Sequence, residues 1–285
     1  MAQHDYILDN NPGATFRGDL NAVLDAIKTL NSGATEPGAI YPGMFWLDTS
    51  AATLLSYPDG RLWQRNQSNS AWVGPGGLIG SNIKVSVLTT SQTWTRPPGL
   101  KFLDAIVVGG GGGVAAAALT AAAQGSGTSG GGGGGTSRKM YAATAITPTV
   151  AVTIGAGGAI GVAGGASIFL GQTGNGGAAG GVLAAGAQGA ANGGAGGAAT
   201  GGDTNTPGSN GGIAWRLLGA YSIGGDGGQS LMCNRVSAVL SATTNPAAAG
   251  MFPGGGARGP SNAASQAAAA GAVGGAGAVI LTEYY

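Results

Sequence analysis

The first 80 residues open on a repeating pattern of apolar positions separated by polar ones. The apolar side chains recur at alternating spacings of four and three; they are Phe16, Leu20, Val23, Ile27 and Leu30. This spacing predicts an amphipathic helix over about 16–31, with Thr15 as its N-cap and Asn31-Ser32-Gly33 at its end. The apolar stripe either covers a small domain or joins copies of the chain around an axis, and two heptads leave both readings open.

Short strand-like runs separated by turn residues follow the helix. They are Phe45–Leu47, Thr53–Leu55, Arg61–Trp63 and Ala71–Val73. Turns such as Pro58-Asp59-Gly60 between them predict a small β-meander that buries Trp46, Trp63 and Trp72, although an aromatic-lined ligand site is the alternative. A module of this size is marginal alone, so we expect residues 1–80 to form an N-terminal domain that oligomerisation or docking completes.

Apolar strands return at three places in the remainder of the chain. They lie near 85–108, 140–155 and 276–285, after a hinge at Gly74-Pro75-Gly76-Gly77. In the first of these regions a turn at Pro97-Pro98-Gly99 places Trp94 and Phe102 where both can cover one shared face. We therefore predict a mainly β protein with one short N-terminal α-helix: a small β-meander followed by a β-framed glycine-rich domain over residues 81–285.

Glycine and alanine fill the segments between these strands, and 61 of the 285 residues are glycine. The segments show neither a helical stripe nor strand alternation, and glycine does not recur at every third position as in collagen. Packed left-handed polyproline II helices suit them, because three residues per turn bring a row of small residues to a surface where backbones can approach and pair. For Val114–Ala123 the alanine content favours a short helix as a competing structure.

Charge is scarce, with 12 basic and 11 acidic residues and a net charge of +1. This balance disfavours nucleic acid and anionic membranes as partners, and no apolar run approaches the roughly 20 residues that cross a bilayer. His4 is the sole histidine and Cys233 the sole cysteine, so a histidine-centred catalytic or metal site is disfavoured and an intrachain disulfide is excluded. Residues 103–113 imitate the opening of a dinucleotide fold but lack the acidic residue about 20 positions later. We expect neither enzymatic activity nor a cofactor nor a metal.

Bulky side chains of the glycine-rich half gather in loop-like runs. The candidate binding residues are Trp215, Arg216, Tyr221, Met251, Phe252 and Arg258. Aromatic and arginine side chains on loops over a stiff scaffold are typical of recognition surfaces. The alternative is that these side chains plug the ends of the glycine-rich segments.

Two parts of the chain together resemble bacteriophage tail fibre proteins. The N-terminal resemblance rests on Asp5-Tyr6, the helix from Phe16 to Leu30, Asn31-Ser32-Gly33, Trp46-Leu47-Asp48-Thr49 and Trp72. The stretch from Thr93 to Tyr285 is similar to the glycine-rich tip domains of phage tail fibres and adhesins, some of which pack their glycine segments as polyproline II sandwiches. The chain departs from such fibres in having almost no shaft between its two parts, which implies a short fibre.

The resemblance implies a virion protein that is assembled in the host cytoplasm. Its N-terminal part is expected to attach to a tail or baseplate protein, and its tip to bind a host surface glycan or outer-membrane protein. We expect a homotrimer whose individually weak tip contacts combine through avidity. Neither nucleic-acid binding nor membrane insertion is expected.

Three other functions are compatible with parts of the pattern. A purely structural tail or baseplate component would need the same anchor but no receptor. A depolymerase would need Asp203, Asp226 and Glu283 within hydrogen-bond reach of one another. A silk-like or ice-binding glycine protein would explain the second half and leave residues 1–80 without a role.

Overall fold

The protein is described by a computed structural model covering residues 12–28, 30–54, 60–74, 83–217, 221–240 and 242–285. The chain divides into two compact units, Met1–Asn82 and Ile83–Tyr285. It is mainly β with a helix near the N-terminus, so the predicted fold class is confirmed. Two sequence features lie outside the described residues: Asp5-Tyr6, part of the tail-fibre resemblance, and Pro75-Gly76-Gly77 of the predicted hinge.

The helix of the first unit, α1, covers Gly13–Lys28 and begins three residues before the expected start. The carbonyl of Pro12 accepts the hydrogen bond of the Thr15 amide at 2.9 Å, so Thr15 lies inside the first turn and is not the N-cap. At the other end the amide of Asn31 donates to the carbonyl of Ala26 at 2.8 Å, and Asn31 has a φ of 53°. A left-handed residue at this place ends a helix as glycine usually does, so the helix stops earlier than predicted.

A three-stranded antiparallel sheet in the order β1-β2-β3 follows α1. Its strands are β1 (Phe45–Asp48), β2 (Arg61–Arg65) and β3 (Trp72–Val73). The rings of Trp46 and Trp72 meet with centroids 5.4 Å apart, and the guanidinium carbon of Arg61 lies 4.0 Å from the ring centroid of Trp63. All three tryptophans are half-buried, not buried as expected, because so small a sheet cannot enclose three indoles.

A single helical turn, α2 (Ala51–Leu54), stands where the sequence predicts a strand at Thr53–Leu55, so that prediction is wrong for its described part. The carboxylate of Asp48 accepts hydrogen bonds from the Ser50 amide at 2.9 Å and from the Thr53 hydroxyl at 2.6 Å. Burial acts to raise the pKa of Asp48, but these hydrogen bonds outweigh it and the pKa lies below its usual value. The N-cap of the turn is Ser50, whose hydroxyl oxygen accepts the hydrogen bond of the Thr53 amide at 3.4 Å, and the ionised Asp48 carboxylate holds this cap in place.

The second unit is built on a five-stranded antiparallel sheet in the order β15-β8-β6-β20-β4. Its strands are β4 (Ile83–Leu88), β6 (Phe102–Val108), β8 (Thr136–Ala142), β15 (Thr204–Thr206) and β20 (Ala278–Tyr284). The last strand lies between β4 and β6, with Ile280 opposite Val87 on one side and Ile106 on the other. The beginning and end of the unit are therefore hydrogen-bonded to each other, and the chain between them forms one long insertion.

A second layer covers one face of this sheet. It contains β5 (Gln92–Thr95), β9 (Thr149–Val152), β10 (Ser167–Phe169), β11 (Gln172–Gly174), β14 (Ala199–Thr200) and the 3₁₀ turn η1 (Ala143–Ala145). The rings of Trp94 and Phe169 meet edge to face at 5.9 Å in a core that includes Leu103 and Leu281. Phe102 is half exposed on the opposite face, so the expectation that it shares a face with Trp94 is wrong. Neighbouring residues of a strand point to opposite faces, and Leu103 is the one that points inward.

Glu283 of β20 is buried beside the core, with 1% of its surface exposed. Its carboxylate accepts hydrogen bonds from the Trp94 indole at 3.2 Å and the Tyr285 hydroxyl at 2.6 Å, and the Lys84 ammonium lies 3.6 Å away. These three partners satisfy a charge that burial alone would penalise, and they link the last strand to β4 and β5.

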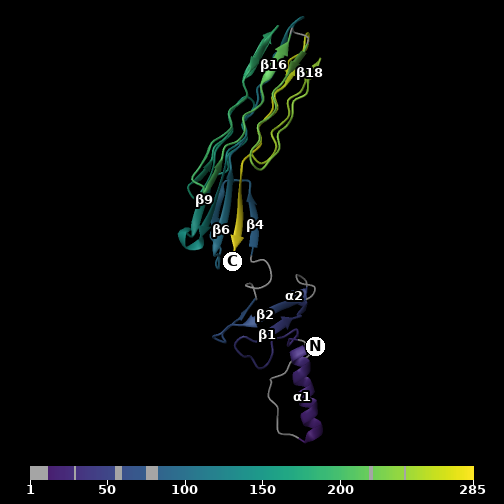
Figure 1. Cartoon of the computed structure of the whole chain (residues 1–285), viewed down its shortest axis with the longest axis vertical. Helices are drawn as coiled ribbons and strands as arrows, with labels where there is room; N and C mark the ends of the chain where they lie inside the picture. Colours follow the sequence, from purple (N-terminus) through teal and green to yellow (C-terminus); the bar gives the residue numbers. More distant parts are fainter. Residues whose placement is uncertain (1–11, 29, 55–59, 75–82, 218–220, 241) are drawn as a thin grey trace. The chain divides into compact units, whose positions relative to one another are not determined.

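Glycine-rich segments run from this double layer toward the far end of the unit, where β16 and β18 lie (Figure 1). The runs Gly109–Gly113 and Gly130–Gly135 are fully buried. The amides of Gly109 and Gly112 donate to Gly135 and Gly132, whereas the amides of Gly110 and Gly113 donate to Gly165 and Val162. The amides of Gly111 and Val114 donate to Gly275 and Ala272. Every third amide thus pairs with the same neighbouring segment, which is the period of a polyproline II helix.

The second buried run follows the same rule. The amides of Gly130 and Gly133 donate to the carbonyls of Gly212 and Ser209. Those of Gly131 and Gly134 donate to Ala257 and Gly254, and those of Gly132 and Gly135 to Ala178 and Asn175. Positive φ does not explain the glycines, because none of the positive-φ glycines among the described residues falls in either run. Space explains them: a Cβ on Gly112 would overlap the carbonyl of Ala178, and one on Gly133 would overlap the carbonyl of Gln229. Only glycine lets the backbones approach this closely.

Two small sheets lie at the far end of the unit. One has the order β12-β7-β19-β18, with β7 (Gly125–Thr128), β12 (Val182–Gly186), β18 (Thr244–Asn245) and β19 (Ser261–Asn262). The other has the order β13-β16-β17, with β13 (Gly189–Ala191), β16 (Ala214–Leu217) and β17 (Tyr221–Ile223). The helix considered for Val114–Ala123 does not form, because Val114 and Ala117 bridge Ala272 and Ala269 instead.

We expect Gly112→Ala to destabilise the second unit by about 3 kcal/mol, since its Cβ would meet backbone that cannot move aside. Gly171→Ala is the control: it has open space but a φ of 77°, and should cost only about 1 kcal/mol. Thermal or denaturant unfolding followed by circular dichroism measures both. Equal losses for the two variants would contradict the close-packing explanation.

We expect stability to fall between pH 10 and 12 through Tyr285. Burial, then the hydrogen bond to Glu283 and its charge, raise the pKa of Tyr285 from 10.0 to about 12. The folded chain therefore keeps a proton that the unfolded chain loses in this window, so the free energy of unfolding declines as pH rises through it and is unaffected by this group below it. Tyr285→Phe should flatten this decline when urea unfolding is measured at several pH values, and an unchanged decline in the variant would contradict the role of Tyr285.

Candidate functional site

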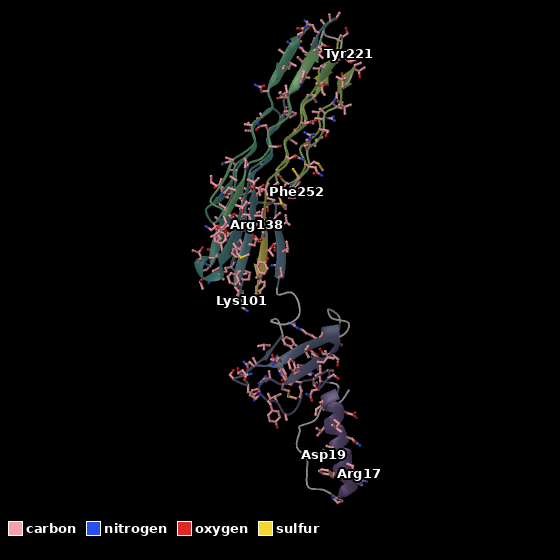
Figure 2. All side chains as sticks on the ribbon, in the orientation of Figure 1. Arg17, Asp19, Lys101, Arg138, Tyr221 and Phe252 are labelled. Atoms are coloured by element: carbon pink, nitrogen blue, oxygen red, sulfur yellow. The ribbon has the colours of Figure 1, made fainter. Side chains whose placement is uncertain are left out.

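The structure brings only part of the predicted binding set together. Trp215, Arg216 and Tyr221 lie on the paired strands β16 and β17. Tyr221 lies at the far end of the second unit, whereas Phe252 lies near the junction of the glycine segments with the five-stranded sheet (Figure 2). Met251 directly precedes Phe252, and Arg258 lies six residues after Phe252. The six residues therefore do not form one surface.

The strands β16 and β17 have one outward and one inward face. Trp215 stands opposite Ile223 and Leu217 opposite Tyr221, so these four side chains share a face. Trp215 is 53% exposed, Leu217 58% and Tyr221 50%. The inward face carries Ala214 and Ser222, which are buried against β7. We call the outward side chains of Trp215, Leu217 and Tyr221 the distal aromatic face.

Arg216 belongs to the inward face and is half-buried there. Its guanidinium lies against Gly186 and Gly189, where an added Cβ would fall within about 3 Å of it. The Nε and Nη1 atoms of Arg216 are buried without a hydrogen-bond partner among the described residues. The Arg216 side chain fills the space beneath the connection between β12 and β13. This space exists because the connection has glycines, and not larger residues, facing the guanidinium.

Arg258 holds a neighbouring loop instead of facing solvent. Its Nη1 donates to the carbonyl of Ser237 at 3.2 Å, and its Nη2 donates to the carbonyl of Pro246. The backbone of Arg258 also bridges Ala248. These bonds fasten the chain on both sides of β18, since Ser237 precedes this strand and Pro246 and Ala248 follow it. Val239 and Leu240, between Ser237 and β18, are exposed. Arg258 is therefore a structural clamp.

Met251 and Phe252 form a separate exposed pair. Met251 is 48% exposed and Phe252 50%, while the adjoining Pro253 is buried. The hydroxyl of Ser230 donates to the carbonyl of Pro253 at 2.6 Å and lies 3.4 Å from the sulfur of Cys233. The pair sits on a locally fastened turn, away from the distal aromatic face (Figure 2).

Sequence reasoning missed Leu217, the most exposed member of the distal aromatic face. The signal was present in the alternation of Trp215 and Leu217 around Arg216, which places the two apolar side chains on one side of a strand. The same alternation would have removed Arg216 from the predicted set.

The helix α1 carries the predicted apolar stripe with one change. Phe16, Leu20 and Ile27 are exposed as a surface for self-association requires, but Val23 is half-buried and Leu24, which is 54% exposed, takes its place. Leu30 lies just beyond α1 and is also exposed. The stripe is open to a partner and slightly rotated from the predicted heptad.

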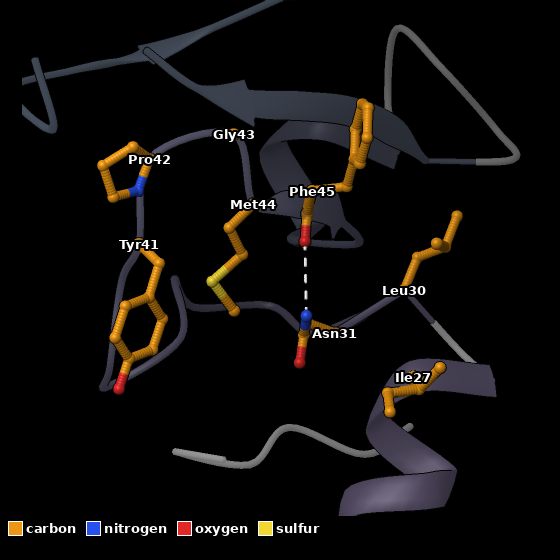
Figure 3. Close-up of a pocket in the computed structure, with 8 residues that line it drawn as sticks. All are labelled: Ile27, Leu30, Asn31, Tyr41, Pro42, Gly43, Met44 and Phe45. Atoms are coloured by element: carbon orange, nitrogen blue, oxygen red, sulfur yellow. Dashed lines mark hydrogen bonds between the residues drawn. The ribbon is translucent and has the colours of Figure 1, made fainter. Parts of the chain in front are cut away.

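A pocket of about 330 Å³ opens beside the end of α1 (Figure 3). It is lined by Ile27, Leu30, Asn31, Tyr41, Pro42, Gly43, Met44 and Phe45. The Asn31 side-chain amide donates to the carbonyl of Phe45 at 3.4 Å and so fastens one wall. The lining is mainly apolar, which suits the side chain of a partner helix better than a charged ligand.

The acidic residues that a hydrolase would need lie in different surroundings. Asp203 accepts the hydrogen bond of the Met140 amide at 3.3 Å, Asp226 pairs with Arg235 at 3.3 Å, and Glu283 is buried against Trp94. These three carboxylates do not form a group. Among the described residues, no three histidine, cysteine or acidic side chains are placed to share a metal ion.

Comparison with protein families assigns most of the second unit. A family described as a glycine-rich domain matches residues 86–284, from within β4 to the end of β20. The chain belongs to the glycine-rich domain family. The glycine-rich domain thus includes the five-stranded sheet, the glycine segments and the distal sheets, and the match does not extend to the first unit. A search of curated proteins gave no match, and within the described ranges no helix is long and apolar enough to span a membrane.

We expect Arg258→Met to loosen the chain on both sides of β18, because the carbonyls of Ser237 and Pro246 lose a charged donor. The free energy of unfolding should fall by about 1 kcal/mol. The amide of Ala238, the residue after Ser237, should exchange with deuterium faster because this part of the chain is less firmly held. Arg216→Met is the matched control, since two of its guanidinium nitrogens have no partner to lose. A larger loss for Arg216→Met than for Arg258→Met would contradict these roles.

Proposed function

We propose that this chain is a short bacteriophage tail fibre that binds a host-cell surface receptor through the distal aromatic face of its glycine-rich domain. The carrying observation is the outward placement of Trp215, Leu217 and Tyr221 on a small sheet at the far end of the domain. Exposed aromatic side chains held on a sheet are the residues that most often dominate binding energy when a partner covers them.

The scaffold beneath this face favours binding because it is fixed before a partner arrives. Buried Ala214 and Ser222 pack the hairpin on β7, and β7 continues into the buried run Gly130–Gly135. Side chains that are ordered in advance lose less conformational entropy on binding. The face is therefore suited to recognition by shape and stacking.

The chemistry of the face indicates what a receptor would present. Trp215 and Tyr221 offer ring surfaces and one hydroxyl, and the nearest arginine, Arg216, points away. Such a face suits the apolar side of a sugar ring or the apolar loop of an outer-membrane protein. A strongly anionic ligand fits it poorly.

The first unit supports the second half of the proposal, attachment and self-association. Its motifs resemble the tail-attaching segment of phage fibres, and α1 presents an apolar stripe that includes Leu20, Leu24 and Ile27. We propose that copies associate through this stripe as a homotrimer attached to a tail or baseplate protein. Several tips on one virion then combine weak contacts into avid binding.

A purely structural tail component is the second candidate. The inward roles of Arg216 and Arg258 favour it, since neither arginine is offered to a receptor. The exposure of Trp215 and Tyr221 argues against it, because a spacer gains nothing from solvent-facing aromatic rings at its end.

The test is binding of the full chain, labelled with a fluorophore at its N-terminus, to a panel of Gram-negative and Gram-positive bacteria in flow cytometry. On strains that bind, Trp215→Ala/Tyr221→Ala should weaken binding about 100-fold, as expected for two hot-spot residues. Met251→Ala/Phe252→Ala is the matched control, because it removes two equally exposed side chains from another place. Unchanged binding by the first variant, or equal loss by both, would refute the proposed face.

A further inference from the structure

The five-stranded sheet has a second apolar face that nothing in its own unit covers. Alternate residues of β4, β6, β8 and β20 point away from the core; prominent among them are Ile83, Val85, Val87, Phe102, Met140 and Tyr284. Val85 is 62% exposed, Met140 53% and Phe102 50%. We call this the outer sheet face. Antiparallel sheets that leave one face to solvent normally place polar residues there.

Among the described residues, the charged side chains on the outer sheet face are Asp104 and Arg138, and these two neutralise each other. Asp104 is 6% exposed and accepts hydrogen bonds from Arg138 at 2.7 Å from Nη2 and 3.1 Å from Nε. Lys84, Lys139 and Glu283 belong to the opposite face of the sheet. The outer sheet face is therefore electrically neutral and presents no unpaired charge to a covering surface.

The outer sheet face is about as large as the largest apolar patch of a typical soluble protein, and such patches are often functional. Four strands about 4.8 Å apart and six residues at about 3.3 Å each give a plane of roughly 20 by 20 Å, or about 400 Å² before side-chain relief is counted. Contiguous apolar patches of this order on soluble proteins usually mark sites of association. Two such planes in contact bury about 800 Å², less than the roughly 1,200 Å² of a stable interface, so the face needs a second contact such as the α1 stripe to hold copies together.

The outer sheet face also reaches an open edge. Within the part of the chain that the structure describes, β4 is paired on one side only, with β20, and it places Ile83, Val85 and Val87 on the outer face. Edge strands of isolated proteins are commonly protected by charged or kinked residues. On this face β4 carries only β-branched apolar side chains, as a strand within an assembly does.

We propose that the outer sheet face is a self-association surface, covered in the assembled protein by the same face of other copies of this chain. A neutral face whose single ion pair is closed internally matches a second copy of itself without leaving a buried charge. The chain also exposes the apolar stripe of α1, so copies joined at the stripe bring their outer sheet faces to high effective concentration. The inference rests on the self-association part of the proposed function and is independent of receptor binding.

The experiment compares the oxidation of two methionines in the full chain. Met140 lies on the outer sheet face and Met251 on a separate turn, and the two are almost equally exposed in one copy, at 53% and 48%. With dilute hydrogen peroxide and mass spectrometry, Met140 should oxidise at least fivefold more slowly than Met251 in the assembled protein. Below the concentration at which light scattering shows dissociation, the two rates should become similar.

Three results would overturn the inference. Met140 that stays protected after dissociation would mean that the chain's own first unit or another internal segment covers the face. Equal oxidation of both methionines in the assembled protein would mean that copies join elsewhere, which would leave the α1 association and the distal aromatic face standing. A chain that remains monomeric at all concentrations would remove the self-association part of the proposal as well.

A pair of variants makes the test specific. Val85→Lys places a charge at the centre of β4 on the outer sheet face, at a position exposed enough for a single copy to fold, and should weaken self-association at least tenfold. Val162→Lys is the control, since Val162 is 53% exposed at a turn outside this face. Equal dissociation constants for the two variants, with unchanged circular dichroism, would also overturn the inference.

Discussion

The close approach of glycine backbones holds the second unit together. Segments that lack side chains pair their amides directly with the carbonyls of neighbours, so the interior between the two sets of sheets is a hydrogen-bonded network in place of an apolar core. Such a network fails wherever an amide loses its partner, because a buried unpaired amide costs as much as a hydrogen bond is worth. This explains why the runs Gly109–Gly113 and Gly130–Gly135 admit no Cβ, while the buried cluster of large apolar side chains lies between the five-stranded sheet and the layer that covers it.

At both ends of the network, successive side chains of a strand point to opposite faces of a sheet. At one end Leu103 and Leu281 enter the core while Phe102 and Met140 face outward. At the other end Ala214 packs inward and Trp215 faces solvent. The glycine segments connect the two, so the distal aromatic face is held by backbone hydrogen bonds that lead back to the five-stranded sheet. The two sets of sheets are therefore linked by a continuous network of backbone hydrogen bonds.

The candidate site could be read only partly from the sequence. The sequence predicted Trp215 and Tyr221 because large aromatic residues are conspicuous in a glycine-rich segment. The position of Arg216 directly after Trp215 also indicated that these two side chains point to opposite faces of a strand. The roles of Arg216 and Arg258 could not be found in this way. Each is determined by what its guanidinium meets: the space beside Gly186 and Gly189 in one case, and the carbonyls of Ser237 and Pro246 in the other. Backbone carbonyls leave no trace in the order of side chains.

Local periodicity let the sequence determine the helix near the N-terminus, the framing strands and the absence of helix or sheet in the glycine runs. These properties depend on residues a few positions apart, where sterics and alternation act directly. Tertiary structure decided everything that depends on distant segments meeting. It placed the last strand between β4 and β6, gave each glycine amide its partner, turned Val114–Ala123 away from helix, and separated Phe252 from Tyr221. Those outcomes follow from which backbones can approach closely, and that is a property of the folded chain as a whole.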